Sequence, residues 1–270
     1  MLNIFRNLFF IAAFLTGLGL TVTNVYGLYQ SMRPLLPADE LRFINDVSLS
    51  YEETLNGVQK IDRESEKEYA ARLTRVIAQG LAHINWNKYD NTRYNQLIPI
   101  WENYFLYFMG KFSGIPEFKR YHYSNYQKSL KRGIGICGDA AMIMSQLLDK
   151  QDIKNQILTF PGHVVVAAQF DGKEFMFDPD FGVALVNSPD KIHDSPWIVN
   201  KYYKQQKYSD REIRNLNAVY GNEYQRWNGV EHFIFKKYYF EKISYMLKWP
   251  LPFLMIIFSL MYFQKKLFRK

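Results

Sequence analysis

Cysteine is nearly absent from this chain, which has one cysteine, Cys137, among 270 residues. A single thiol excludes an intrachain disulfide and a zinc site made of several cysteines, so Cys137 is either a buried apolar residue or a reactive group. The sequence also lacks internal repeats and low-complexity linkers, while 48% of its residues are hydrophobic. That composition is sufficient for a buried core, and we expect one ordinary folded domain or two small ones.

Charged residues are missing from Asn7 to Met32. Because about 20 apolar residues cross the hydrocarbon layer of a bilayer, this stretch predicts a transmembrane helix at residues 7–30. A cleaved signal peptide is the alternative, with Arg6 as its basic start and Val25–Gly27 as its cleavage site. Both interpretations place the middle of the chain on the same side of the membrane.

A second uncharged segment, residues 249–264, is short for a membrane span. It reaches the length of about 20 residues that a span requires only if residues 243–247 join the helix and Lys248 extends its ammonium group toward the interface. On that basis we expect a second transmembrane helix at residues 243–264.

Basic residues crowd the end of the chain, where residues 265–270 include Lys265, Lys266, Arg269 and Lys270. The positive-inside rule predicts that this tail is cytoplasmic. Two spans then place residues 34–242 outside the cytoplasm. The four cations equal half of the formal net charge of +8, so the basic balance indicates membrane topology better than it indicates nucleic-acid binding.

The middle of the chain divides into a helical part, residues 34–120, a mixed catalytic core, residues 121–200, and a C-terminal extension, residues 201–242. In the helical part apolar residues recur at helical spacing, for example at Leu73, Ile77 and Leu81. The pattern predicts helices within residues 37–59, 65–84 and 94–112, the last with Pro99 near its first turn, where proline is tolerated.

The pattern changes after Cys137. A helix of about 12 to 14 residues is predicted from the cysteine onward by its apolar face. Three strands follow at residues 155–160, 163–170 and 173–178, and Asp171–Gly172 forms a two-residue hairpin turn between the last two. A helix followed by antiparallel strands predicts an α+β domain.

Three glycines around the cysteine, Gly133, Gly135 and Gly138, form a G-x-G-x-x-G pattern. A dinucleotide-binding turn of this kind needs an apolar strand before it and an acidic residue about 20 positions further on. The preceding residues are polar and mixed, and Leu158 occupies the later position. The glycines therefore favour close backbone approach around a thiol over phosphate binding.

Cys137 lies at a predicted helix start, where the helix dipole favours the reactive thiolate. His163 opens one predicted strand and Asp178 ends the next, which supplies a nucleophile, a base and an orienting carboxylate in chain order. If Phe170 pairs with Lys173, Asp178 lies diagonally next to His163, about 7 to 8 Å away in the backbone. The same register puts Asp180 directly opposite His163, so geometry leaves both aspartates open.

The remaining histidines have no carboxylate partner at motif spacing, and we interpret them as structural or surface residues: His83, His122, His193 and His232. Asp139, in the first turn of the predicted helix, is expected to stabilise the helix start, because a negative charge there interacts favourably with the helix dipole.

The segments GICGDAAMIMSQLL and GHVVVAAQFDGKEFMFDPD, within residues 124–190, resemble the core of the transglutaminase-like cysteine superfamily, relatives of papain-fold enzymes. The resemblance implies an α+β papain/transglutaminase-like core, in which the nucleophile-bearing helix packs on an antiparallel sheet. It also implies that Cys137 is the nucleophile, His163 the base and Asp178, followed by proline, the third member. Family members often have an aromatic residue after the histidine, whereas this chain has Val164, and this departure concerns substrate binding more than the triad.

These observations predict a membrane-anchored cysteine acyl-transfer enzyme, an amidase, peptidase or transglutaminase-like transferase. The Cys137 thiolate would attack an amide or ester carbonyl, and His163 would protonate the leaving group. The reaction needs no metal or organic cofactor. The backbone N–H of Cys137 is one expected oxyanion donor, and Tyr126 or Gln127 is proposed as the second.

The resemblance to membrane-tethered bacterial members of the superfamily implies a role in cell-envelope or polysaccharide biosynthesis. We expect the protein to lie in the bacterial inner membrane, with its catalytic domain on the periplasmic side. The expected partners are the lipid bilayer, a peptide, protein or glycoconjugate substrate, and envelope or polysaccharide-biosynthesis proteins, with no nucleic acid. A catalytically silent binding or assembly module of the same fold is the alternative, and thiol reactivity distinguishes the two. An oxidoreductase is disfavoured because a single thiol has no resolving partner.

Overall fold

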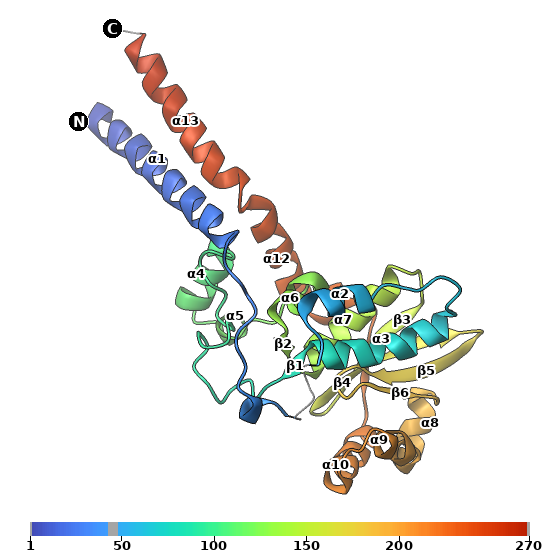
Figure 1. The fold of residues 1–270 in the computed structure, drawn as a ribbon. Coiled ribbons are helices and arrows are strands. Elements are labelled where there is room, and N and C mark those ends of the chain that lie inside the picture. Colours follow the sequence, from blue (N-terminus) through green and yellow to red (C-terminus); the bar gives the residue numbers. More distant parts are fainter. Residues whose placement is uncertain (1, 43–47, 269–270) are drawn as a thin grey trace. The chain divides into compact units, whose positions relative to one another are not determined.

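The computed structural model describes residues 2–42 and 48–268 and contains an antiparallel sheet with helices on both faces (Figure 1). The strands are β1 (Ala82–His83), β2 (Ile134–Gly135), β3 (Asn155–Phe160), β4 (His163–Phe170), β5 (Lys173–Asp178), β6 (Val183–Leu185) and β7 (Gln225–Trp227). The longer helices are α1 (Leu2–Gly27), α3 (Glu66–Gly80), α4 (Tyr104–Phe112), α7 (Cys137–Asp149), α10 (Asp210–Tyr220), α12 (Phe235–Leu247) and α13 (Pro250–Leu267). The shorter ones are η1 (Ala38–Glu40), α2 (Tyr51–Gly57), α5 (Pro116–Lys119), α6 (Tyr126–Arg132), α8 (Pro189–Asp194), η2 (Pro196–Val199), α9 (Asn200–Gln205) and α11 (Val230–Phe233).

The chain forms two compact units. We call them the terminal unit and the sheet unit. The terminal unit contains the residues up to Met32, Asp90–Tyr121, and the residues from Tyr239 onward, and the sheet unit contains Arg33–Tyr89 and His122–Tyr238. Residues 90–121, predicted as part of the helical region of the middle domain, thus group with α1 and α13.

The main sheet has five strands in the order β6-β5-β4-β3-β7, and neighbouring strands are antiparallel. Phe170 pairs with Lys173, as predicted. Asp171 and Gly172 both have positive φ, 50° and 72°, which is typical of the type I′ turn that joins strands through two residues. The sequence therefore determines the hairpin register through this turn, and the register fixes which side chains share a face.

Alternating residues of β4 enter two separate cores. Val166 and Ala168 pack with buried side chains of α3 and α7 on one face of the sheet. Val165 and Ala167 pack with α9 and α10 on the other face. This alternation is the period-2 geometry of a strand with both faces covered. The predicted α+β class and the predicted packing of the cysteine-bearing helix on an antiparallel sheet are confirmed.

The predicted helices of the first half are confirmed in part. Residues 65–84 contain α3, whose start is fixed by a capping box between Ser65 and Glu68. The stretch 37–59 contains only η1 and α2, and residues 43–47 lie outside the described residues.

The helix predicted at residues 94–112 is wrong over its first part, since α4 begins at Tyr104. The Asn103 side chain accepts hydrogen bonds from the backbone N–H groups of Phe105 (3.0 Å) and Leu106 (3.2 Å) and so caps the helix there. The residues before it form turns, with the N–H of Glu102 donating to Pro99 O at 2.9 Å.

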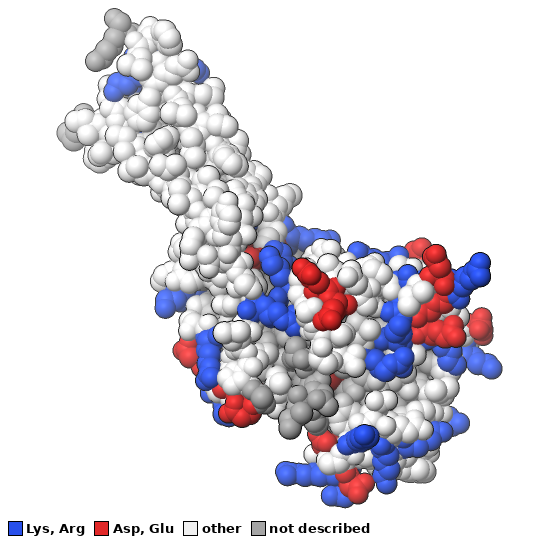
Figure 2. All heavy atoms as spheres, viewed as in Figure 1, with Lys and Arg blue, Asp and Glu red and all other residues white. Residues whose placement is uncertain are grey.

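The terminal unit contains the helices with membrane-like character. One described helix is long and apolar enough to cross a membrane alone, at Asn3–Gly27. At the other end α12 and α13 meet the same criterion only together, and they are bent by 42° at a short break. In Figure 2 the surface of α1 and α13 is nearly free of charged side chains, with cations near the chain ends.

The break between α12 and α13 corrects the predicted helix at residues 243–264. Residues 243–247 end α12, and a new helix begins at Pro250. Lys248 does not extend toward the interface: its side chain is buried and Nζ donates to the carbonyl oxygens of Trp101 (3.3 Å) and Glu102 (2.6 Å). A buried ammonium group needs such acceptors, and these carbonyl oxygens replace the hydrogen bonds that water would accept from it.

Candidate functional site

Cys137 is the first residue of α7, as predicted, and its side chain is partly exposed. The preceding residue, Ile136, has an extended backbone (φ −133°), and its N–H donates to Asp139 Oδ2 at 2.9 Å. Asp139 thereby stabilises the helix start. Gly135 packs so tightly that a Cβ there would lie 2.7 Å from Asp139 Cβ. Gly135, two residues before the cysteine, thus allows the close approach inferred from the sequence.

His163 is the first residue of β4 and is buried, with 5% of its surface exposed. Its Nε2 lies 2.9 Å from Asp178 Oδ2. The Cys137 thiol is close enough to the imidazole to contribute to the raised pKa of His163, and because Nε2 faces Asp178, Nδ1 is the ring nitrogen available to the thiol. The structure therefore brings together the three residues of the predicted triad, with His163 in the middle.

The Asp178 carboxylate is fully buried and accepts hydrogen bonds at both oxygens. Oδ2 accepts from the hydroxyls of Tyr203 (2.7 Å) and Tyr220 (3.1 Å) in addition to its contact with His163. Oδ1 accepts from the backbone N–H groups of Asp180 and Phe181, both at 3.2 Å. These donors hold the carboxylate in one position and offset the cost of burying its charge.

Electrostatics favour a protonated imidazole at this position. Burial by itself would lower the pKa of His163, but the charge and hydrogen bond of Asp178, together with Cys137, outweigh burial and raise that pKa well above 6.5. Burial and the Asp178 charge also raise the pKa values of Tyr203 and Tyr220 well above 10, so both phenols stay neutral donors.

Asp180, the second aspartate that the register left open, has different partners. Its Oδ1 lies 2.7 Å from Nδ1 of His83, and its Oδ2 accepts from Arg42 at 2.8 Å. Burial alone would raise the pKa of Asp180, but His83 and Arg42 lower it well below its usual value. The Arg42 guanidinium also lies 3.9 Å from the ring centre of Phe181. Asp180 thus anchors the strand end that carries Asp178.

The other histidines, interpreted from the sequence as structural or surface residues without a carboxylate at motif spacing, have carboxylate neighbours in the structure, and the shortest of these contacts are those of His83 and His122. His83 contacts Asp180, and Nδ1 of His122 lies 2.7 Å from Oδ2 of the fully buried Asp139. His83 is far from Asp180 in the sequence, and His122 lies outside the family motif, so residue spacing did not indicate either pair. His122 stacks on Trp86, with 4.4 Å between ring centres, and this pair supports the helix start behind Cys137.

The predicted second oxyanion donors, Tyr126 and Gln127, are in the wrong place. The backbone N–H of Tyr126 donates to Gln146 Oε1 at 3.2 Å, and its hydroxyl accepts from Lys150 Nζ at 2.7 Å. Lys150 caps the C-terminal end of α7, about 20 Å from Cys137 at 1.5 Å per residue. Since α6 runs antiparallel to α7, its first residues lie at the end away from the thiol.

A cavity of about 450 Å³ adjoins the N-terminal side of the cysteine. It is lined by Glu40, Leu41, Arg42, His83, Ile84, Asn85, Trp86 and Ile136. Ile136, the residue before Cys137, belongs to this lining, which makes the cavity a candidate for part of the substrate site. The lining mixes apolar, aromatic and charged groups, which is typical of ligand-binding clefts.

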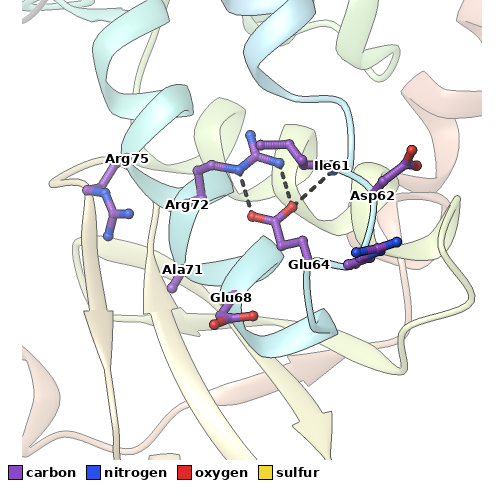
Figure 3. Close-up of a pocket in the computed structure, with 8 residues that line it drawn as sticks. Ile61, Asp62, Glu64, Glu68, Ala71, Arg72 and Arg75 are labelled. Atoms are coloured by element: carbon purple, nitrogen blue, oxygen red, sulfur yellow. Dashed lines mark hydrogen bonds and ion pairs between the residues drawn. The ribbon is translucent and has the colours of Figure 1, made fainter.

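A second cavity, of about 480 Å³, lies at the start of α3 (Figure 3). Its main feature is a bidentate ion pair, in which Arg72 Nε and Nη2 contact the two carboxylate oxygens of Glu64 at 2.7 and 2.8 Å. Arg72 also donates to the carbonyl oxygen of Gln59. These contacts hold the loop before α3, and the cavity contains none of the three triad residues.

A helix with a thiol at its first residue, packed on an antiparallel sheet that carries a His–Asp pair, is the arrangement expected of papain-like thiol proteins. Residues 59–188 match a family model described as a transglutaminase-like domain. The chain therefore carries a domain of the transglutaminase-like superfamily, and the match extends further toward the N-terminus than the motifs identified in the sequence. Searches of curated proteins and of solved structures gave no match.

Proposed function

We propose that this protein is a membrane-anchored cysteine enzyme that transfers acyl groups through Cys137, His163 and Asp178. The observation that carries the proposal is the position of His163, which contacts a buried, multiply hydrogen-bonded Asp178 through Nε2 and is close enough to Cys137 for the thiol to affect its pKa. A histidine between a thiol and a carboxylate is the arrangement that activates a nucleophile, because it stabilises the thiolate and orients the imidazole.

In the first step Cys137 Sγ forms a bond with the substrate carbonyl carbon, and negative charge develops on the carbonyl oxygen. The backbone N–H of Cys137 is a suitable donor for that oxygen, since the first N–H groups of a helix have no acceptor within it. The His163 imidazolium then gives its proton to the leaving amine or alcohol as the C–N or C–O bond breaks.

In the second step water or an acceptor amine attacks the thioester. His163, now neutral, takes the proton from the attacking group, and the C–S bond breaks to return the thiolate and the imidazolium. Asp178 keeps the ring oriented and stabilises its positive charge throughout. The choice of water or amine as acceptor decides between hydrolysis and transfer.

The membrane anchor is part of the proposal. The length and composition of α1 support a membrane span. Its contacts with the C-terminal helices favour retention of α1 over its removal as a signal peptide. Gly17 allows close approach to Pro252, and Asn24 Nδ2 donates to Lys248 O at 2.8 Å. The basic residues after α13 favour a cytoplasmic C-terminus. This topology would place the sheet unit on the periplasmic side of a bacterial inner membrane, where envelope glycoconjugates and peptides supply amides and esters.

Acetylation by p-nitrophenyl acetate tests the proposed chemistry. We expect the wild type to acquire an acetyl group on Cys137, detected by peptide mass spectrometry, and to release it on standing. Cys137→Ser should lose the adduct, and His163→Ala should form it at least about tenfold more slowly. His232→Ala changes an exposed histidine and is the matched control.

Equal acetylation rates in the wild type and His163→Ala would contradict the proposal. That result would favour the alternative, a binding or assembly module of the same fold that acts in a membrane-bound envelope complex.

A further inference from the structure

The helix α4 exposes an aromatic stripe to its surroundings. Phe108 is 45% exposed, Phe112 is 72% exposed and Ile115, just beyond the helix, is 41% exposed. Phe108 and Phe112, four residues apart, lie on the same side of α4. Phe108 and Phe112 stack on each other with ring centres 6.0 Å apart. Large apolar groups gathered in this way indicate an interaction surface.

The start of α4 is tied to the end of α1. Tyr104, the first residue of α4, donates its hydroxyl to the carbonyl oxygen of Lys248 at 3.2 Å. The same carbonyl oxygen accepts from Nδ2 of Asn24, in the last turn of α1, at 2.8 Å. One backbone carbonyl in the break between α12 and α13 therefore joins α1 and α4.

Two further contacts fix this junction. Gly27, the last residue of α1, packs against the backbone carbonyl of Trp101, where a Cβ would clash. Nδ2 of Asn103, whose side chain caps α4, donates to Ser244 Oγ at 3.2 Å. Both Asn103 and Ser244 are buried. The helix α4 is thus held rigidly at the level where α1 ends.

The composition of the stripe fits a lipid interface. Between Tyr104 and Ile115 the only charged residue in the sequence is Lys111, and a lysine stem can lie along apolar surface while its ammonium group reaches water or lipid phosphate. At the end of α1, Tyr26 and Tyr29 are exposed at 55% and 83%. Exposed aromatic residues at the end of a membrane helix are typical of the belt at the headgroup level.

We infer that α4 is an interfacial helix, whose Phe108, Phe112 and Ile115 side chains insert into the headgroup region of the bilayer that α1 enters. This inference rests on the proposed membrane span of α1. At nine residues α4 is about 14 Å long, so its whole stripe lies within reach of the boundary. Insertion of such a stripe to a depth of about 5 to 10 Å is usual for helices of this kind. The consequence is a shallow attachment in addition to the proposed spans, which would hold α4 at a fixed depth in the bilayer surface.

Depth-dependent fluorescence quenching tests the inference on the full chain. Because Cys137 is the only cysteine, the Cys137→Ser protein can be labelled at one site with a nitrobenzoxadiazole probe after Phe112→Cys. The protein is reconstituted into phosphatidylcholine and phosphatidylglycerol vesicles that carry a nitroxide on the headgroup, at acyl carbon 5 or at acyl carbon 12. Leu15→Cys, in the middle of α1, reports the span, and Trp197→Cys, an exposed apolar site of the sheet unit, is the control.

We expect the Phe112 probe to be quenched by headgroup and carbon-5 nitroxides at least about twofold more than the Trp197 probe. The Leu15 probe should be quenched most by the carbon-12 nitroxide. If the Leu15 probe is quenched in this way and the Phe112 probe is not quenched above the control, the interfacial role of α4 is wrong. If the Leu15 probe is not quenched, the proposed span of α1 fails, and the inference about α4 fails with it. Labelling at Ile115→Cys provides the same readout if Phe112→Cys does not fold.

Discussion

Two histidine–aspartate pairs lie close together in the sheet unit, and their contacts have almost the same length. His163 and Asp178 are 2.9 Å apart, and His83 and Asp180 are 2.7 Å apart. The pairs differ in their third partners. The pKa of His163 is also affected by the nearby Cys137 thiol, while Asp180 also binds Arg42. A short His–Asp contact therefore does not identify a catalytic pair by itself, and the group on the other side of the imidazole or carboxylate decides its role.

The pairs also differ in burial. The side chain of His163 is 6% exposed and Asp178 is fully buried, whereas the side chain of His83 is 27% exposed. In the first pair the carboxylate is fixed by two tyrosine hydroxyls and two backbone N–H groups. In the second the carboxylate is neutralised by a cation. The first arrangement maintains a negative charge beside the histidine, and the second anchors the chain.

The largest difference between the pairs is expected on removal of the carboxylate charge. We expect Asp178→Asn to lower the acyl-transfer rate by about 10³-fold or more, since the same change in a serine triad costs about 10⁴-fold. Asp180→Asn should lower the rate by about tenfold or less, equivalent to about 1.4 kcal/mol. Steady-state kinetics with p-nitrophenyl acetate measure both. Equal losses in the two variants, with both proteins folded by circular dichroism, would remove the distinction between the pairs.

A smaller effect is expected when the support of Asp178 is weakened. Tyr203→Phe and Tyr220→Phe each remove one hydroxyl from the carboxylate without changing the shape of the core. A hydrogen bond to a charged group contributes about 1.5 to 3 kcal/mol, so we expect losses of this size in the free energy of unfolding by urea titration. Tyr208→Phe, which removes a hydroxyl contact to the carbonyl of Phe181 and not to Asp178, is the matched control. Losses no larger than that of the control would contradict the role assigned to the two tyrosines.

The smallest expected effect is a dependence of stability on pH. The pKa of His163 is raised on folding, so its protonated form stabilises the folded protein most below the unfolded pKa of about 6.5. The contribution is lost as pH rises through the raised folded pKa. The difference in Tm between wild type and His163→Gln should therefore be largest near pH 6 and decrease toward alkaline pH. A difference that is constant or increases with pH would contradict a raised pKa, and His232→Gln is the exposed control.

The sequence predicts the local parts of the site well. The α7 helix and the β4–β5 hairpin follow from apolar periodicity and from the Asp171–Gly172 turn, and these signals lie within a few residues of the elements that they define. The strand register alone did not show whether Asp178 or Asp180 is the partner of His163. It depends on His83, which belongs to β1 and meets Asp180 only through the tertiary fold.

Other wrong or missing predictions also depend on tertiary contacts between residues far apart in the sequence. Tyr203 and Tyr220 come from the C-terminal extension and carry no motif, so their contacts with Asp178 could not be predicted. The misplaced donors Tyr126 and Gln127 follow from the unpredicted antiparallel direction of α6. By contrast, the start of α4 was readable, because Asn103 before an apolar run is a standard cap signal. The break at Lys248 depends on carbonyl groups far away in sequence.

The most direct test of the account is the rate of Cys137 alkylation by iodoacetamide at pH 6, in the wild type beside His163→Ala. An ordinary thiol with a pKa of about 8.5 is almost entirely protonated and slow at this pH. We predict rapid labelling of the wild type and at least about tenfold slower labelling without His163, as expected for an imidazolium-stabilised thiolate. Slow labelling at the same rate in both proteins would show that His163 does not activate the thiol and would contradict the proposed triad.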